Sequence, residues 1–407
     1  MKGIFRLPLT IQIRLWGSFL NRITSSSIMP FIALYLTERT SKEFAGTYLL
    51  LTVIIIFLSN IISGYFCDKF GRKKILNVFS TFESICLFTI FLSVSINSTS
   101  LFIIMYMLYI LVSTFKRPAL TALIQDAVTK ENKKLVYRLD YWLTNLSLAI
   151  GASLGGFLYK DYKEGLFLSL TITSFILTIL YILFIKENKR LKNNNHKNPI
   201  MDFYISYREV ITDKRYVSLV IGGALILSAE LCTSSYISVR LAEDFKDINM
   251  LGIDITGIKM FSLINIINTT MVILFTFIVG FCVDRFSFKK IFIIGLIAYI
   301  CGYTALMSAN SFYMLVFSII IATLGELVYS PIKSTEQLDL VPKEKRGVYA
   351  SFSSVGYTLS DSIAKITLIL SSFLSPIFIS IFIFFIVSIG SILLYLSIFY
   401  KRKIVNT

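Results

Sequence analysis

Three acidic residues lie inside long apolar segments of this 407-residue chain, and their position there indicates a chemical role. They are Asp140, Glu230 and Glu326. A charge inside a hydrocarbon layer is unfavourable unless it is paired or solvated by a cavity, so such residues are functional candidates by default. A carboxyl in these surroundings can bind and release a proton. We predict that the three couple proton movement to the activity of the protein, with a structural Asp140–Arg138 pair as the alternative for Asp140.

Basic residues also lie within apolar segments. Arg22 is deep in the first one, and Lys116 and Arg117 directly precede Pro118. A cavity lined by these cations would suit an anionic or zwitterionic substrate, but they could equally neutralise the buried acids in a network. The aromatic pair Tyr141 and Trp142 could stack a substrate or simply pack. We assign seven residues to a substrate cavity: Arg22, Lys116, Arg117, Arg138, Tyr141, Trp142 and Asn145.

The elements that hold these residues are membrane-spanning helices. The chain is 55% hydrophobic and only 16% charged, whereas a soluble domain has about 25% charged residues. Runs of about 20 apolar residues are long enough to cross a bilayer as a helix, and the short alternating segments of a β-barrel do not occur. We predict an all-α membrane protein of twelve transmembrane helices. Their approximate ranges are 11–37, 43–67, 75–95, 99–124, 135–159, 164–186, 216–240, 257–283, 290–309, 311–335, 347–371 and 376–400.

The net charge of +16 follows from the same topology. Lys and Arg are concentrated in the two terminal segments, in the polar stretch after residue 186 and in the loops on the same side. Few lie in the loops on the opposite side. Positive residues accumulate in cytoplasmic loops. We therefore expect a multi-pass protein of the cell (inner) membrane with both termini in the cytoplasm, and nucleic-acid binding is not needed to explain the charge.

Two halves of the chain repeat each other. GYFCDKFGRKK at residues 64–74 matches GFCVDRFSFKK at 280–290, and DAVTKENKKLVY from Asp126 matches DLVPKEKRGVY from Asp339. A polar, Asn- and Lys-rich stretch separates the halves. We predict an N-terminal six-helix bundle over 1–187, a cytoplasmic linker over 188–214 and a C-terminal six-helix bundle over 215–407.

The segment GYFCDKFGRKK resembles the loop signature between helices 2 and 3 of the major facilitator superfamily. That resemblance implies a fold of two pseudo-symmetric six-helix bundles and a cytoplasmic gate whose latch includes Asp68, Arg72 and Asp126. In physical terms, Gly64 allows close helix approach and Gly71 allows a tight turn. The gate motif as we assign it comprises Gly64, Asp68, Lys69, Gly71, Arg72, Lys73 and Asp126.

A closer resemblance is carried by RLDYWLTNLSLAIGASLGGFL at 138–158, by LGELVYSP at 324–331 and by IQIRL at 11–15. These segments are similar to the LmrP-type branch of the drug:proton antiporters, which implies export of apolar and cationic compounds in exchange for protons. The branch's membrane carboxylates fall on Asp140 and Glu326. In the helix-5 antiporter signature, Ala152 stands in place of proline, which weakens the antiport inference from that motif.

We therefore expect a secondary transporter, not an enzyme, that exports drugs or other amphipathic small molecules by proton-coupled alternating access. A dedicated exporter of an anionic or zwitterionic metabolite, such as a siderophore or peptide, is the alternative. No nucleotide-binding loop is present, and five cysteines and one histidine show no metal-ligand spacing. We expect no cofactor and no metal, the proton as coupling ion, a small-molecule substrate, lipid contacts, no nucleic acid and a monomer.

Overall fold

The computed structural model describes residues 7–129, 132–185, 207–208, 210–250, 252–283, 287–341 and 346–400, which form helices almost throughout. The helices of the first part are α1 (Leu9–Ser26), α2 (Ile32–Arg39), α3 (Lys42–Phe70), α4 (Arg72–Ser95), α5 (Thr99–Ala127) and α6 (Lys133–Phe184). Those of the second part are α8 (Lys214–Cys232), α9 (Ser238–Asp244), α10 (Gly257–Val283), α11 (Phe288–Ser308), α12 (Phe312–Leu340), α13 (Arg346–Leu370) and α14 (Pro376–Tyr395). Every predicted helix has a counterpart among them.

Two predicted helices are interrupted. The predicted helix 11–37 is divided into α1 and α2 by the 3₁₀ segment η2 (Met29–Phe31), because Pro30 has no N–H with which to continue an α-helix. The predicted helix 216–240 contains the π-helical segment η3 (Thr233–Ile237), which separates α8 from α9.

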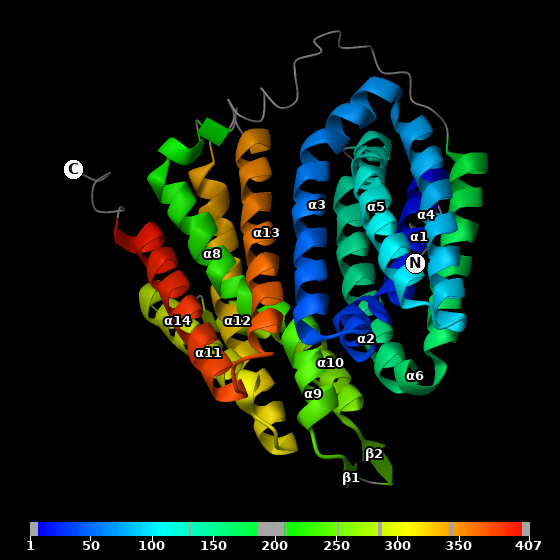
Figure 1. Cartoon of the computed structure of the whole chain (residues 1–407). Coiled ribbons are helices and arrows are strands. Elements are labelled where there is room, and N and C mark those ends of the chain that lie inside the picture. The colour runs from blue at the N-terminus through cyan, green and yellow to red at the C-terminus, as the bar shows by residue number, and fades with distance from the viewer. Residues whose placement is uncertain are drawn as a thin grey trace. The chain divides into compact units, whose positions relative to one another are not determined.

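Two further predicted helices, 135–159 and 164–186, run together as α6, in which Tyr162 alone has a non-helical backbone (φ −130°, ψ 30°). At the other end of the chain, α14 passes into a second π segment, η5 (Leu396–Tyr400). A short hairpin that was not predicted follows α9 (Figure 1), with β1 (Ile248–Met250) antiparallel to β2 (Ile253–Ile255) and Ile248 opposite Ile255.

Nine helices in the described part of the chain are long and apolar enough to cross a membrane. Their outward-facing surfaces are rich in large apolar side chains such as Phe88, Ile294 and Phe385, which are all more than a third exposed. A helix that is apolar on its exposed face as well as on its packed face is characteristic of a bilayer environment. Length, composition and exposure therefore agree with the predicted membrane protein.

Two compact units are defined by contacts within the chain. Unit 1 comprises Met1–Met29 and Ile54–Phe203, and unit 2 comprises Pro30–Val53 and Tyr204–Thr407. Their boundary falls inside the continuous helix α3, between Val53 and Ile54. The predicted division at residues 187 and 215 stays a prediction.

Unit 1 is held together by the packing of α1 against α6 and of α4 against α5 and α6. Ile13, Leu76 and Leu177, from three different helices, meet in one buried apolar cluster. The close approach of α1 and α6 depends on Gly151, where a Cβ atom would lie 2.6 Å from the Ile23 carbonyl oxygen. Gly71, which precedes α4, has φ +88°, the left-handed conformation expected for a glycine at this turn.

Unit 2 is built around α8, which packs against α13 and α14, and around the closely packed pair α11 and α12 (Figure 1). Tyrosine hydroxyls connect its helices: Tyr299 Oη donates to Ile226 O (3.1 Å), Tyr216 Oη to Tyr349 O (2.8 Å) and Tyr236 Oη to Met307 O (3.1 Å). A buried tyrosine hydroxyl needs a partner. These three bonds therefore fix which faces of α8, α11 and α13 meet.

Many serine and threonine hydroxyls in both units donate to a carbonyl oxygen of their own helix. Thr89 Oγ1 donates to Ile85 O (2.9 Å), and Thr173 Oγ1 donates to Ser169 O (2.8 Å). The hydroxyl of Ser84 is different, because it joins α4 to Ser174 and Thr178 of α6 at 2.9 Å each. Backbone-directed bonding allows a polar residue to occupy an apolar helix without a partner from another helix.

Candidate functional site

Glu326 is held in place by a hydrogen-bonded amide in unit 2. The Nδ2 group of Asn268 on α10 donates to Glu326 Oε2 at 3.2 Å and to Thr323 Oγ1 at 3.0 Å, both on α12. Thr323 also donates to Ile319 O at 2.7 Å, so its oxygen is oriented to accept from Asn268. The amide orients one oxygen of the carboxyl and leaves the other available to a proton or a cation.

Glu230 on α8 is the second carboxyl of this site. It interacts electrostatically with Glu326 and with Lys333, which lies two residues after Pro331 on α12. The Lys333 side chain lies against Gly223, two turns before Glu230 on the same helix. Lys333 is thus directed at α8. Two carboxyls and one ammonium group from facing helices therefore share one region of unit 2. The proton-coupling role assigned to Glu230 and Glu326 stays a prediction.

Three buried tyrosines surround the two carboxyls. Tyr299, Tyr303 and Tyr329 are each less than 5% exposed and interact electrostatically with both Glu230 and Glu326. The ring centroids of Tyr299 and Tyr303 are 4.5 Å apart, and those of Tyr299 and Tyr329 are 5.0 Å apart. We call Glu230, Glu326, Asn268, Lys333 and these tyrosines the carboxyl site. Both carboxyls are half-buried, and the tyrosine rings beside them strengthen the electrostatic interactions within the site.

Asp140 forms a separate charged group in unit 1. Arg22 Nη1 on α1 lies 3.3 Å from Asp140 Oδ1 on α6 and also donates to Thr144 Oγ1. Thr144 in turn donates to Asp140 O at 2.6 Å. Arg14, which lies about two helical turns before Arg22 on α1, also interacts electrostatically with Asp140. Arg22 therefore pairs with one of the buried acids, which was one of the two alternatives for the basic residues.

Lys116 has a partner that the sequence reasoning did not identify. Its ammonium on α5 binds Glu83 Oε2 on α4, and the two residues are only 9% and 7% exposed. We expected Lys116 either to line a cavity or to neutralise Asp140, Glu230 or Glu326. The prediction for its partner was wrong, because Glu83 occupies the facing position on the adjacent helix.

The other predicted cavity residues are less clearly grouped. Arg117 is exposed and interacts electrostatically with Tyr109. Trp142 is 56% exposed, and Asn145 is half-buried. The side chains of Arg138 and Tyr141 lie outside the described part of the chain. Whether these residues meet one substrate therefore stays a prediction.

Of the gate motif, the structure describes Gly71, Arg72 and Lys73 with their surroundings. Arg72 and Lys73 are half-buried at the start of α4, next to the turn at Gly71. The side chains of Asp68, Lys69 and Asp126, and the surroundings of Gly64, lie outside the described part. The gate assignment stays a prediction.

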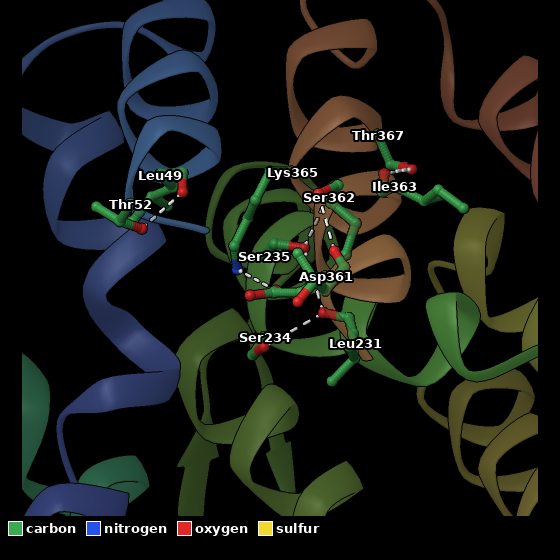
Figure 2. Close-up of polar contacts among 12 residues, drawn as sticks. Leu49, Thr52, Leu231, Ser234, Ser235, Asp361, Ser362, Ile363, Lys365 and Thr367 are labelled. Carbon is green, nitrogen blue, oxygen red and sulfur yellow. Dashed lines mark hydrogen bonds and ion pairs between the residues drawn. The ribbon is translucent and has the colours of Figure 1, made fainter. Parts of the chain in front are cut away.

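A second polar group in unit 2 lies where α13 meets the π segment η3. Asp361 Oδ1 and Lys365 Nζ form an ion pair at 3.2 Å (Figure 2). The Ser235 hydroxyl of η3 donates to Ala364 O at 3.0 Å, and Ser234 Oγ donates to Leu231 O at 3.2 Å. Asp361 and Lys365, one helical turn apart on α13, therefore neutralise each other.

The sequence reasoning missed Asn268 and the tyrosines of the carboxyl site. The signals were an amide within the apolar segment 257–283 and the Tyr299–Tyr303 spacing of one helical turn, which would place both rings on one face. Within the described ranges, no group of three or more His, Cys, Asp or Glu residues could hold a metal ion. The carboxyl site supplies oxygen ligands suited to a proton or a weakly bound cation.

Apolar helices long enough to span a bilayer and charged groups inside them define a multi-pass membrane protein of the transporter class. The profile of the Major Facilitator Superfamily matches residues 15–271 and 219–404, and the chain belongs to this superfamily. A Na(+), Li(+), K(+)/H(+) antiporter of Planococcus maritimus is 24% identical over 88% of this chain and 88% of its own length. The MFS-type transporter YqjV of Bacillus subtilis (strain 168) is 24% identical over 88% of this chain and 84% of its own.

Solved structures of transporters share this fold. A POT family transporter in complex with 5-aminolevulinic acid superposes with a TM-score of 0.71 at 17% identity, covering 96% of each chain. The nucleoside transporter NupG superposes with a TM-score of 0.70 at 14% identity, covering 96% of this chain and 100% of its own. The predicted fold class, an all-α membrane protein of twelve transmembrane helices in the major facilitator fold, is confirmed.

Proposed function

We propose that this membrane transporter is a proton-coupled antiporter that exports cationic substrates, and that the carboxyl site binds the proton and the substrate in alternation. The observation that carries the proposal is the placement of Glu230 and Glu326 within electrostatic reach of each other among buried tyrosines. Two carboxylates close together in a region of low dielectric repel each other. One proton or one cation relieves that repulsion, so the two compete for the same site.

Competition between the proton and the cation for the carboxyl site is sufficient to exchange one for the other across the membrane. A proton arriving at Glu326 lowers the negative charge of the site and releases a bound cation, and loss of the proton restores cation binding. Lys333 strengthens this competition because its ammonium already offsets one negative charge beside Glu230. Asn268 keeps one oxygen of Glu326 fixed. The substrate must therefore approach the other carboxyl oxygen of Glu326.

For the substrate, we propose drugs or other amphipathic organic cations, in keeping with the resemblance to the LmrP-type branch. Monovalent metal cations are the second candidate, favoured by the relative from Planococcus maritimus that is named for Na(+), Li(+) and K(+) exchange. An anionic or zwitterionic metabolite receives less support. Arg22 is paired with Asp140 and Lys116 with Glu83, so two of the cations that would bind it have acidic partners.

Asp140 is proposed as a further proton-coupling group in unit 1. Its pairing with Arg22 and the bond between Arg22 and Thr144 form a network that protonation of Asp140 would release. We further propose a cell (inner) membrane location with both termini cytoplasmic, the proton as coupling ion, contacts with lipids and a monomeric state.

The test uses the full-length protein in proteoliposomes with an imposed pH gradient. Proton release is followed with a pH-sensitive dye after adding ethidium, Na⁺ or K⁺, and ethidium efflux is followed separately. Glu326→Gln and Glu230→Gln should each lower proton-driven exchange at least about tenfold, because a neutral amide cannot bind a proton. Glu164→Gln is the matched control, since Glu164 is an exposed acid outside the site. Exchange that survives in Glu326→Gln at the wild-type rate would remove the carboxyl site from the mechanism.

Arg22→Gln separates the cationic from the anionic proposal. A cation antiporter should retain ethidium or Na⁺ exchange in this variant, because both the carboxyl of Asp140 and the carboxyl site are unchanged. A transporter of anionic metabolites should lose its activity in the same variant.

A further inference from the structure

Lys333 places a positive charge in the carboxyl site from the side of α12. The residue is half-buried and interacts electrostatically with Glu230 of α8. Gly223 of α8 provides the space that the lysine side chain occupies, because a Cβ atom at Gly223 would overlap Lys333 Cε and Nζ. The ammonium group is therefore packed against the neighbouring helix, within unit 2.

The register of α8 against α12 directs this ammonium toward the carboxyls. Gly223 faces Lys333. Glu230 lies seven residues after Gly223 on α8. Glu326 lies seven residues before Lys333 on α12. Seven residues are about two turns, or about 10 Å along each helix, so the matched levels require antiparallel helices. Helical side chains lean toward the N-terminal end of their own helix, which brings the charged ends of Lys333 and Glu230 closer together from opposite directions.

Charged groups on the surrounding helices do not alter the balance of this site. On α13, Asp361 and Lys365 neutralise each other. Near the beginning of α8, Arg215 is paired with Glu336 of α12 at 3.7 Å. Helix α14 contains no charged residue. The other charged residues of α8, α10, α11 and α12 lie close to helix ends: Lys214, Lys259, Lys289, Lys290 and Asp339. Among the described residues, the charges of the carboxyl site are therefore two carboxylates and one ammonium.

We propose that Lys333 limits the carboxyl site to one positive charge at a time, so that it selects singly charged cations and exchanges each for one proton. This inference rests on the function proposed above and adds the valence of its substrate and its stoichiometry. Two carboxylates and one ammonium leave the empty site with one negative charge. One proton or one singly charged cation makes the site neutral, whereas a dication leaves an uncompensated positive charge, which is unfavourable inside the membrane.

The same charge balance makes exchange obligatory. Moving an unpaired charge through the hydrocarbon region is costly, so the empty site with its one negative charge resists reorientation. Both loaded forms are neutral and reorient more easily. The transporter therefore returns only with a proton or a cation bound, and no net charge crosses the membrane in a complete cycle.

Substrate gradients at equilibrium test the stoichiometry in proteoliposomes of the full-length protein, with protein-free liposomes to correct for leak. A pH difference of about one unit should sustain about a tenfold gradient of ethidium or Na⁺, because one proton balances one cation. A membrane potential of about 60 mV should leave this gradient unchanged, whereas movement of one net charge would shift it about tenfold. Such a shift would overturn the inference but not the proposed function. Absence of any proton-driven exchange would overturn the proposed function.

Lys333→Gln tests the selection of singly charged cations. Without the ammonium the empty site has two negative charges, so a dication or two protons make it neutral. Exchange of propidium, a dication with the ring system of ethidium, or of Ca²⁺ in place of Na⁺ should rise at least about tenfold over the wild type. Lys290→Gln, the same change at an exposed position on α11, should exchange dications as poorly as the wild type does. Equal dication exchange in the wild type and Lys333→Gln would overturn the assignment.

A double variant separates charge balance from a structural role of the lysine. Glu230→Gln alone leaves one carboxylate and one ammonium, so the empty site is already neutral and neither a proton nor a cation is needed. Adding Lys333→Gln restores one negative charge, carried by Glu326, and exchange of singly charged cations should rise about tenfold over Glu230→Gln. A double variant no more active than Glu230→Gln would overturn the inference, because a lysine that only supports the fold cannot be removed with a gain in transport.

Discussion

The buried ion pair between Glu83 and Lys116 allows a test of what Lys116, a basic residue within a membrane-spanning helix, does. Lys116 is either a structural partner of Glu83 or a ligand for an anionic substrate, and these roles predict different responses to paired substitution. Both side chains are about nine-tenths buried. Removing one partner from such a pair costs about 3–5 kcal/mol, because the remaining charge is left without a counterion.

We therefore expect Lys116→Met and Glu83→Met each to lower the free energy of unfolding by about 3–5 kcal/mol. For a chain of this size that corresponds to a fall in Tm of roughly 4–6 °C. Methionine is close in volume to both residues, so the double variant removes both charges without opening a large cavity. Its stability should lie within about 1 kcal/mol of the wild type.

The assay combines thermal unfolding with transport in proteoliposomes. The double-variant cycle should show a favourable coupling of about 3 kcal/mol or more, and the double variant should transport at the wild-type rate. Additive losses would refute the ion pair as a stabilising unit. A stable double variant that no longer transports would instead refute the structural assignment and make Lys116 a substrate ligand.

Two other substitutions test features described above. At Gly325 a Cβ atom would lie 2.4 Å from the Tyr299 backbone nitrogen, so Gly325→Ala should separate α11 from α12 and lower the Tm by several degrees. Gly165→Ala, where nothing lies within 4 Å, should leave the Tm unchanged. Asn268→Leu removes the donor to Glu326, and it should reduce proton-driven exchange about tenfold while membrane insertion is retained. Wild-type exchange by this variant would show that the amide does not position the carboxyl.

Helix existence was predictable because apolar runs of membrane-spanning length are strong signals. The range 257–283 agrees with α10 at both ends. The interruptions were harder to predict. The π segment Thr233–Ile237 has no Pro or Gly to mark it. The break before α2 did carry a signal, Pro30, but the apolar run continues across it.

The candidate site was predictable in its charges but not in its pairings. An acid within an apolar segment is conspicuous, so Glu230 and Glu326 were identified. Which group lies opposite depends on helix rotation and packing, which a single sequence does not specify. For this reason the Glu83–Lys116 pair was missed. Asn268 was missed because neutral amides are common in helices. Its role is recognisable only from its hydrogen bond to Glu326 in the folded structure.

Hydroxyls that bond within their own helix have a mechanical consequence. Thr89 and Thr173 carry their acceptors with them, so a helix can slide along a neighbour or rotate against it without breaking those bonds. The interface with directional bonds behaves differently: Ser84 joins α4 to both Ser174 and Thr178 of α6. During a transport cycle, shear should therefore concentrate at surfaces whose hydroxyls are satisfied internally, while α4 and α6 travel as one piece.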